Sequence, residues 1–316
     1  MEAPTTVRYK PSMSITAAAM VHPRSRAQRI ALVALIAGAL AIAFSPIFVR
    51  LSELGPTATA FHRVALAVPL LWAWRAIEDR REGAAPRLPQ RKVWMLILAG
   101  ACFSGDLAFW HWSIKLTSVA NATLFANFTP IFVTVGAYFL LGERVRPSFL
   151  LGLALALAGA VLLMGDSLAL SFDHLLGDGF GVVTAVFYGG YILVVTRLRN
   201  AVSVPRIMLW SGVVTAIVLL PVALLSGESV VPTTLHGWLI LIGLAWGSHA
   251  AGQSFIAYAL AHLPASFSSV ALLVQPVGAA LLAWALLAEP LGTLQALGGA
   301  VVLAGVLVAR RASRPT

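Results

Sequence analysis

The sequence predicts an all-α membrane protein in which ten transmembrane helices form two inverted five-helix repeats. Three observations support this prediction: the composition, the length of the apolar runs and an internal repeat. The 316 residues are 59% hydrophobic and only 11% charged, whereas a soluble domain carries about 25% charged residues. The mean hydropathy is +0.88. A water-soluble fold does not fit this composition, and the chain has room for about ten spans of ~20 residues.

Charges and Gly/Pro/Asp clusters divide the chain into ten apolar runs. A run in lipid must satisfy its own backbone polar groups, and these runs lack the alternation of barrel strands, so we expect helices. The first repeat is expected over residues 30–165 and the second over 178–309, between basic tails at 1–29 and 310–316. The expected spans are Ile30–Val49, Thr57–Trp74, Val93–Trp112, Ser118–Leu141, Pro147–Met164, Gly179–Thr196, Ile207–Leu225, Gly237–Tyr258, Ala265–Leu287 and Gly292–Ala309.

The basic residues predict the orientation. On this map all but three of the 22 Lys and Arg residues lie on the side that carries both termini. The exceptions are Arg50 and Lys115 on the other side and Arg63 inside a span. Because cytoplasmic loops carry the excess of Lys and Arg, we expect a multi-pass inner-membrane (plasma-membrane) protein with both termini in the cytoplasm. The same placement argues against a nucleic-acid partner, despite the net charge of +10.

An internal repeat appears when the sequence is shifted against itself by about 146 residues. Pro, Glu and paired Gly are sparse enough for their matches to indicate a duplication. Five spans per copy force the second copy to enter the membrane in the opposite orientation. Inverted repeats are typical of secondary transporters, whose substrate site lies near the midplane between the halves. The matched pairs are Pro130 with Pro276, Glu143 with Glu289, Gly152 with Gly298, and Gly159 with Gly305.

With these motifs, residues 30–309 resemble an EamA-type permease of the drug/metabolite transporter superfamily. The first copy reads Leu116-Thr-Ser-Val-Ala-Asn-Ala-Thr-Leu, followed by Pro130 and Gly142-Glu143-Arg144. The second reads Leu263-Pro-Ala-Ser-Phe-Ser-Ser-Val-Ala, followed by Pro276 and Ala288-Glu289-Pro290. The resemblance implies export or exchange of amino acids, nucleosides, other small metabolites or drugs, with no cofactor. It leaves the substrate, the direction, the coupling ion and the oligomeric state open.

Two ionisable residues lie within spans, where a charge costs about 3 kcal/mol on insertion scales. Arg63 and Asp106 each lie six residues from the outer end of a predicted span, about 9 Å deep, and are placed to pair. As a gate or substrate anchor, Arg63 would take a carboxylate and Asp106 an amine or a proton. The alternatives are a fixed structural ion pair, or an Arg63 side chain that snorkels to the surface.

Further candidates lie near these two charges or near the matched prolines. Trp110 shares the helix face of Asp106, although an interfacial aromatic belt also explains it. Asn127 and Gln275 lie next to Pro130 and Pro276, which are expected to bend their helices. Both amides are candidates for the pocket, with helix-to-helix hydrogen bonding as the alternative.

The eighth span adds Trp246, His249 and Gln253, whose i, i+3 and i+7 spacing predicts one stripe at central depth. A histidine there would permit proton coupling, but a neighbouring helix can also satisfy it. Outside the pocket, we expect Gly152 and Gly159 to pack helices closely. Glu143 and Glu289 are expected to anchor span ends at the interface.

Other function classes find less support. There is no HExxH pair, and neither Ser104 nor Ser211 has a GxSxG setting, so an enzyme is not expected. The single cysteine, Cys102, offers no thiolate metal site. A channel, or a lipid or sugar-nucleotide translocator of the same fold, remains the alternative to a carrier of small molecules.

Overall fold

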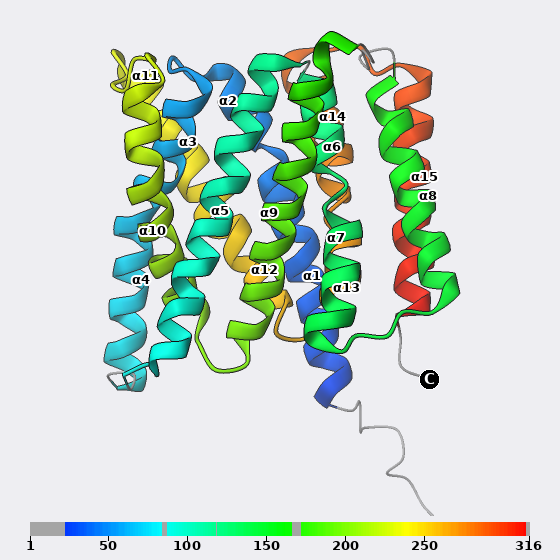
Figure 1. Cartoon of the computed structure of the whole chain (residues 1–316), viewed down its shortest axis with the longest axis horizontal. Coiled ribbons are helices and arrows are strands. Elements are labelled where there is room, and N and C mark those ends of the chain that lie inside the picture. Colours follow the sequence, from blue (N-terminus) through cyan, green and yellow to red (C-terminus); the bar gives the residue numbers. More distant parts are fainter. Residues whose placement is uncertain (1–22, 84–86, 118, 166–171, 314–316) are drawn as a thin grey trace, which may run out of the picture.

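The structure, a computed structural model, describes residues 23–83, 87–117, 119–165 and 172–313. These residues form helices and connecting loops, and no strand occurs among them. Figure 1 shows the helices side by side, crossing the same slab in alternating directions. The all-helical class predicted from the sequence is confirmed for the described residues.

Nine segments of the described chain are long and apolar enough to cross a membrane. The second predicted span is not among them. It consists of α3 (Pro56–Ala65) and α4 (Ala67–Glu82), and six of the last eight residues of α4 are charged. Together α3 and α4 run alongside the other helices in Figure 1, so a tenth crossing stays a prediction.

The nine apolar segments agree with the other predicted spans to within a few residues at most ends. One extension matters for the site: α5 continues to Leu116, four residues beyond the predicted end of its span. The elements are α1 (Pro23–Ala43), α2 (Ser45–Leu51), α5 (Gln90–Leu116), α6 (Val119–Ala126), α7 (Thr129–Gly136), η1 (Ala137–Leu141), α8 (Pro147–Met164), η3 (Phe172–His174), α9 (Leu175–Arg199), α10 (Val204–Leu225), α11 (Leu235–Ile242), η4 (Gly243–Gln253), α12 (Ser254–Ala259), α13 (Ala265–Ala271), α14 (Val274–Leu287) and α15 (Thr293–Ala312).

Proline divides several spans near their middle. The break between α6 and α7 lies just before Pro130, and that between α13 and α14 just before Pro276. Pro46 similarly follows the break between α1 and α2. Because proline has no N–H and clashes with the preceding turn, a helix is interrupted there. The predicted bends at Pro130 and Pro276 are confirmed.

The eighth span contains a π-helix, η4, flanked by α11 and α12. A π-helix bonds residue i to i+5 and therefore rotates successive side chains differently from an α-helix. The predicted stripe of Trp246, His249 and Gln253 does not hold: Trp246 is 47% exposed, whereas His249 and Gln253 are buried. Spacing alone could not reveal this, because the prediction assumed 3.6 residues per turn.

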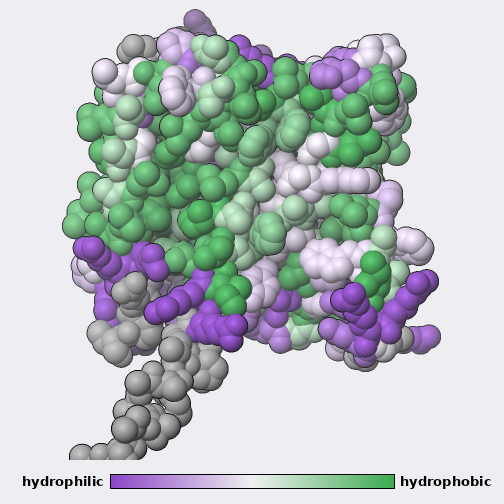
Figure 2. Space-filling model, turned by 180° about the vertical axis from the view of Figure 1, so that it is seen from behind, coloured by the Kyte–Doolittle hydropathy of each residue, from purple (hydrophilic) through white to green (hydrophobic). Residues whose placement is uncertain are grey.

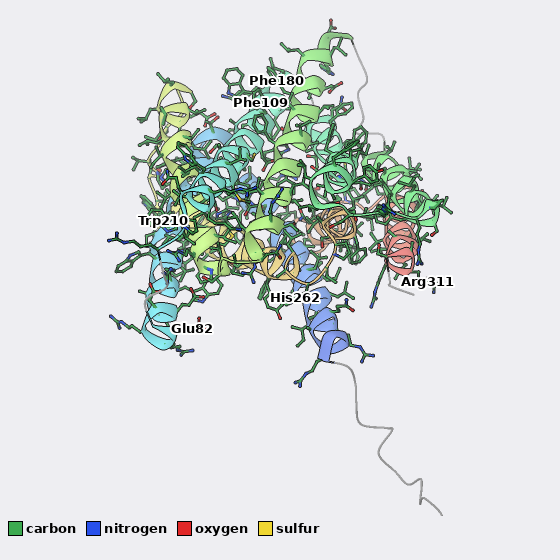
Figure 3. The ribbon with its side chains drawn as sticks, turned by 60° about the horizontal axis from the view of Figure 1, so that its bottom comes forward. Glu82, Phe109, Phe180, Trp210, His262 and Arg311 are labelled. Carbon is green, nitrogen blue, oxygen red and sulfur yellow. The ribbon has the colours of Figure 1, made fainter. Side chains whose placement is uncertain are left out.

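Polar residues gather at the two ends of the bundle, with an apolar band between them (Figure 2). One end, which we call the basic end, is where α1 begins and α15 finishes (Figure 1). Figure 3 turns this end forward and labels Glu82, His262 and Arg311 on it, from α4, the loop after α12, and α15. Both ends of the described chain thus lie at the same end of the bundle.

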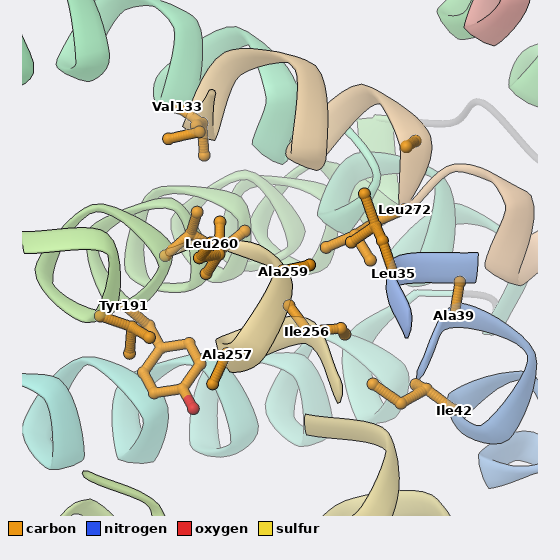
Figure 4. Close-up of a cluster of buried hydrophobic side chains, with 14 of the residues drawn as sticks. Leu35, Ala39, Ile42, Val133, Tyr191, Ile256, Ala257, Ala259, Leu260 and Leu272 are labelled. Atoms are coloured by element: carbon orange, nitrogen blue, oxygen red, sulfur yellow. The ribbon is translucent and has the colours of Figure 1, made fainter. Parts of the chain in front are cut away.

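Small and medium-sized apolar side chains fill the interior of the bundle. Figure 4 shows one part of it, where Leu35 and Ile42 of α1 approach Ile256 and Leu272. Elsewhere α8 and α15 meet so closely that a Cβ on Gly159 would lie 2.4 Å from the backbone nitrogen of Val302. The predicted close packing at the glycines is confirmed.

Candidate functional site

A cavity of about 190 Å³ lies inside the bundle, and several broken spans form its wall. The breaks before Pro46 and Pro276 and the one beside Asn127 all reach it. Irregular backbone at membrane depth is tolerated where it lines a cavity, and transporters use such discontinuous helices for binding. The cavity contains six of the eight candidate residues from the sequence: Arg63, Asp106, Trp110, Asn127, Gln253 and Gln275.

Arg63 of α3 and Asp106 of α5 both line this cavity, and both side chains are only half-buried. Their charges interact, yet the pair is not among the ion pairs within 4.0 Å of the described residues. The two charges are thus near enough to interact but form no direct ion pair, and their role stays a prediction. Because α5 continues to Leu116, Asp106 lies ten residues, about 15 Å, from the end of its helix, deeper than the ~9 Å predicted. Both charges remain open to a ligand.

Several polar atoms in the cavity wall have no hydrogen-bond partner among the described residues. They are buried, and they include both donors and acceptors. A buried polar group without a partner costs about 1–3 kcal/mol, so such groups are uncommon unless something else satisfies them. A polar ligand in the cavity would do so. These atoms are Arg63 Nε, Asn127 Nδ2, Thr184 Oγ1, Gln253 Oε1 and Gln275 Nε2.

Tyr188 was missed by the sequence analysis. It lines the cavity from α9, and its hydroxyl interacts with the side chains of Gln253 and Gln275. An isolated tyrosine in an apolar span is typical of packing, so the sequence does not mark Tyr188 as a site residue. The available signal was Thr184, because an i, i+4 pair of hydroxyl residues shares one face of the helix. Both face the cavity.

An aromatic layer lies beneath Asp106, toward the basic end. Phe103, one turn before Asp106 on α5, lines the cavity. Tyr191 packs against it with ring centroids 4.9 Å apart, and His249 stacks on it at 5.3 Å. His249 is 1% exposed and does not line the cavity, and neither ring nitrogen has a partner within the described part of the chain. His249 therefore packs against the Phe103 ring outside the cavity.

Trp246 is not brought to the cavity. Its indole nitrogen donates to the carbonyl oxygen of Leu66, 3.0 Å away, at the break between α3 and α4. The tryptophan therefore satisfies a carbonyl that the break would leave open. This is a structural role on the outer surface of the bundle.

Comparison with known proteins places this architecture in a family. The profile of the EamA-like transporter family matches residues 29–165 and again residues 175–311. The chain belongs to the EamA-like transporter family. It is thus a multi-pass membrane transporter of the drug/metabolite type, with two copies of the family unit.

Individual relatives agree with this membership. The chain is 24% identical to the pseudopaline exporter CntI of Pseudomonas aeruginosa over 80% of this chain and 86% of that one. It is 27% identical to a probable terminal-alkyne amino-acid exporter of Streptantibioticus cattleyicolor, over 86% and 89%. A solved crystal structure shares the fold at a TM-score of 0.75 and 22% identity, covering 92% of this chain and 98% of that chain.

At the basic end of this EamA-like transporter, Glu143 joins the two family units. Its carboxylate accepts hydrogen bonds from the backbone N–H of Ala265 (2.7 Å), and from the N–H (3.1 Å) and hydroxyl (2.6 Å) of Ser266. The first amides of a helix have no partner within it, so a carboxylate there is stabilised. The prediction that Glu143 anchors its span at the membrane interface did not include its main contact, which is with the start of α13. Its repeat partner Glu289 is ion-paired with Arg50 instead.

The opposite end of the transporter is held by two other glutamates. Glu228 accepts from the backbone N–H of Ala58 at 2.9 Å and lies 3.0 Å from Lys115 Nζ. Burial raises the pKa of Glu228, but the Ala58 and Lys115 contacts outweigh it, so its pKa is lowered overall. Glu53 accepts from Thr233 and Thr234, and the Thr234 hydroxyl contributes most to lowering the pKa of Glu53.

Proposed function

We propose that this protein is a secondary transporter that exports a small, amino-acid-like zwitterion. The observation that supports this most directly is the placement of Arg63 and Asp106 in one cavity without a direct ion pair. A zwitterion bound there would give the guanidinium a carboxylate and the aspartate an amine. Each charge would then have the partner that a charge within the membrane requires.

The size and lining of the cavity support the same class. Its volume of about 190 Å³ is below the ~300–1,000 Å³ of typical drug-sized pockets. Trp110 and Phe103 add aromatic surface, which accommodates an ammonium group or an apolar side chain. Nucleosides and small drug-like compounds remain the other substrates of interest. Two relatives are named as exporters, one of them of an amino acid, and this favours export.

Alternating access between two inverted five-helix repeats is the mechanism that we propose. The glycine contacts support it: a Cβ on Gly152 would approach the Gly305 oxygen, and one on Gly298 the Gly159 oxygen, each at 2.8 Å. A shift of 146 residues exchanges these two contacts, as a pseudo-twofold axis between repeats requires.

The remaining contacts fit one state of such a cycle. Toward the basic end the Phe103 layer and the Glu143 contacts close the bundle, whereas Asp106 and Trp110 line the cavity on the other side of that layer. We take the basic end as cytoplasmic, because Lys and Arg are retained there. The cavity then lies toward the outer side of the inner membrane, the side to which an exporter releases its substrate.

The test is a metabolite-toxicity screen in cells that make the wild type or the Asp106→Asn variant. Cells are challenged with amino acids, dipeptides, nucleosides and cationic drugs, and intracellular levels are measured by mass spectrometry. We expect depletion of an amino-acid-like compound by the wild type only, at equal abundance of both proteins in the membrane. Unchanged levels of every compound would contradict export. A substrate-stimulated current far above carrier turnover would identify a channel instead.

A further inference from the structure

A second cavity, of about 540 Å³, lies between α1, α4, α10 and the η4–α12 segment. We call it the lateral cavity, and it shares no lining residue with the first. Its walls are almost entirely apolar. Ile30, Leu70, Trp74 and Phe255 line it and are 38–48% exposed on the surface of the bundle. The lateral cavity therefore opens toward the medium around the helices, which for a membrane protein is lipid.

The lateral cavity has about the length of one leaflet. At the basic end it is lined by Val204, the first residue of α10, and by Tyr258, the last but one of α12. Twelve residues before Tyr258 it ends at Trp246, which corresponds to about 18 Å at the ~1.5 Å rise of an α-helical residue. This is a little over half of the ~30 Å hydrocarbon core of a bilayer. An extended apolar chain entering from the basic end would fill it.

Basic side chains occur near the lateral cavity at the basic end, where the carboxylates of Glu78 and Asp79 pair with Arg75 and leave Arg26 as the candidate for a headgroup. Arg26, Ile30 and Ala34 recur every four residues on α1, so Arg26 lies one turn beyond the apolar wall on the same face. Arg75 follows the lining residue Trp74. Although Arg75 is ion-paired within α4, its charge and that of Arg206 are close enough to interact. Basic side chains at this level of a membrane attract anionic headgroups.

We propose that the lateral cavity binds one acyl chain of an anionic phospholipid, with the lipid phosphate against Arg26. The apolar walls account for the chain, and the arginines account for the charge. A zwitterionic lipid would gain only the burial of its acyl chain against the apolar walls. The site is separate from the substrate cavity, and the proposal does not depend on what that cavity transports.

The experiment uses the purified full-length protein, freed of lipid in detergent and titrated in native mass spectrometry. The probes are phosphatidylglycerol and phosphatidylcholine with identical acyl chains. We expect the wild type to bind phosphatidylglycerol more tightly. Arg26→Gln should weaken phosphatidylglycerol about fivefold and leave phosphatidylcholine unchanged, since a cation near a membrane surface contributes about that factor. Ala251→Trp fills the cavity, and it should weaken both lipids about tenfold, the loss expected for roughly two buried CH₂ groups.

Ala154→Trp is the matched control, because Ala154 is exposed on α8 and does not line the lateral cavity; it should bind like the wild type. Thermal unfolding verifies that each variant is folded, and Ala34→Phe replaces Ala251→Trp if that variant is not. Wild-type binding by a folded cavity-filling variant would overturn the proposal. So would an Arg26→Gln variant with unchanged preference for phosphatidylglycerol. Displacement of the lipid by inorganic phosphate alone would show a simple anion site and would also overturn it.

Discussion

Replacing Gly159 with alanine tests one of the closest helix contacts among the described residues. The new Cβ would lie 2.4 Å from the backbone nitrogen of Val302 and 2.8 Å from the carbonyl oxygen of Gly298. Backbone atoms cannot rotate out of the way, so α8 and α15 must move apart. Alanine favours the helix by up to ~1 kcal/mol over glycine, but overpacking costs about 1–3 kcal/mol. A gap of even 0.5–1 Å also weakens contacts along the whole interface. We expect a net loss of about 1–2 kcal/mol.

The assay is thermal unfolding in detergent at one fixed heating rate, followed by the monodisperse fraction in size-exclusion chromatography. Gly179→Ala on α9 is the matched control, because a Cβ there would have nothing within 4 Å. The control should be as stable as the wild type or slightly more stable, whereas Gly159→Ala should unfold several degrees earlier. Gly305→Ala, at the repeat-related position, should lose stability similarly. A Gly159→Ala variant as stable as Gly179→Ala would refute the reasoning.

Three further predictions concern the site and the two ends. Tyr188→Phe should raise KM severalfold at equal abundance, because the hydroxyl that interacts with the cavity glutamines is lost; an unchanged KM would exclude a role in binding. Glu143→Gln should lower the melting temperature and weaken the contact between Glu143 and the start of α13, since charge-assisted bonds to Ser266 are worth about 1.5–3 kcal/mol each. Unchanged stability would contradict this. The lowered pKa of Glu228 means that its contribution is present above the ordinary value of 4.5 and is lost as pH falls through the folded value. Glu228→Gln should therefore be less stable than the wild type at pH 7, and this difference in stability should narrow as the pH falls below 4.5; a constant difference would argue against the Lys115 pairing.

Much of the fold and the central pair of candidates could be predicted from the sequence. Apolar run length predicted the nine segments of the described chain that are long enough to cross a membrane, because the bilayer imposes one thickness on every span. The cost of a charge in lipid singled out Arg63 and Asp106 without any structural information. Pro130 and Pro276 located two of the broken spans, because a missing N–H acts locally.

Only the tertiary structure decided how these parts combine. Glu143 reaches α13 across more than a hundred residues, and local sequence does not reveal that pairing. The π-helix of the eighth span turned Trp246 outward and left Gln253 in the cavity, because its register depends on packing and not on composition. Tyr188 became a site residue only when two glutamines from other spans met its hydroxyl. The sequence by itself indicated which segments are long and apolar enough to cross a membrane, since length and hydropathy are properties of single helices. The cavity depended on the tertiary structure, because its properties arise from side chains that different helices bring together.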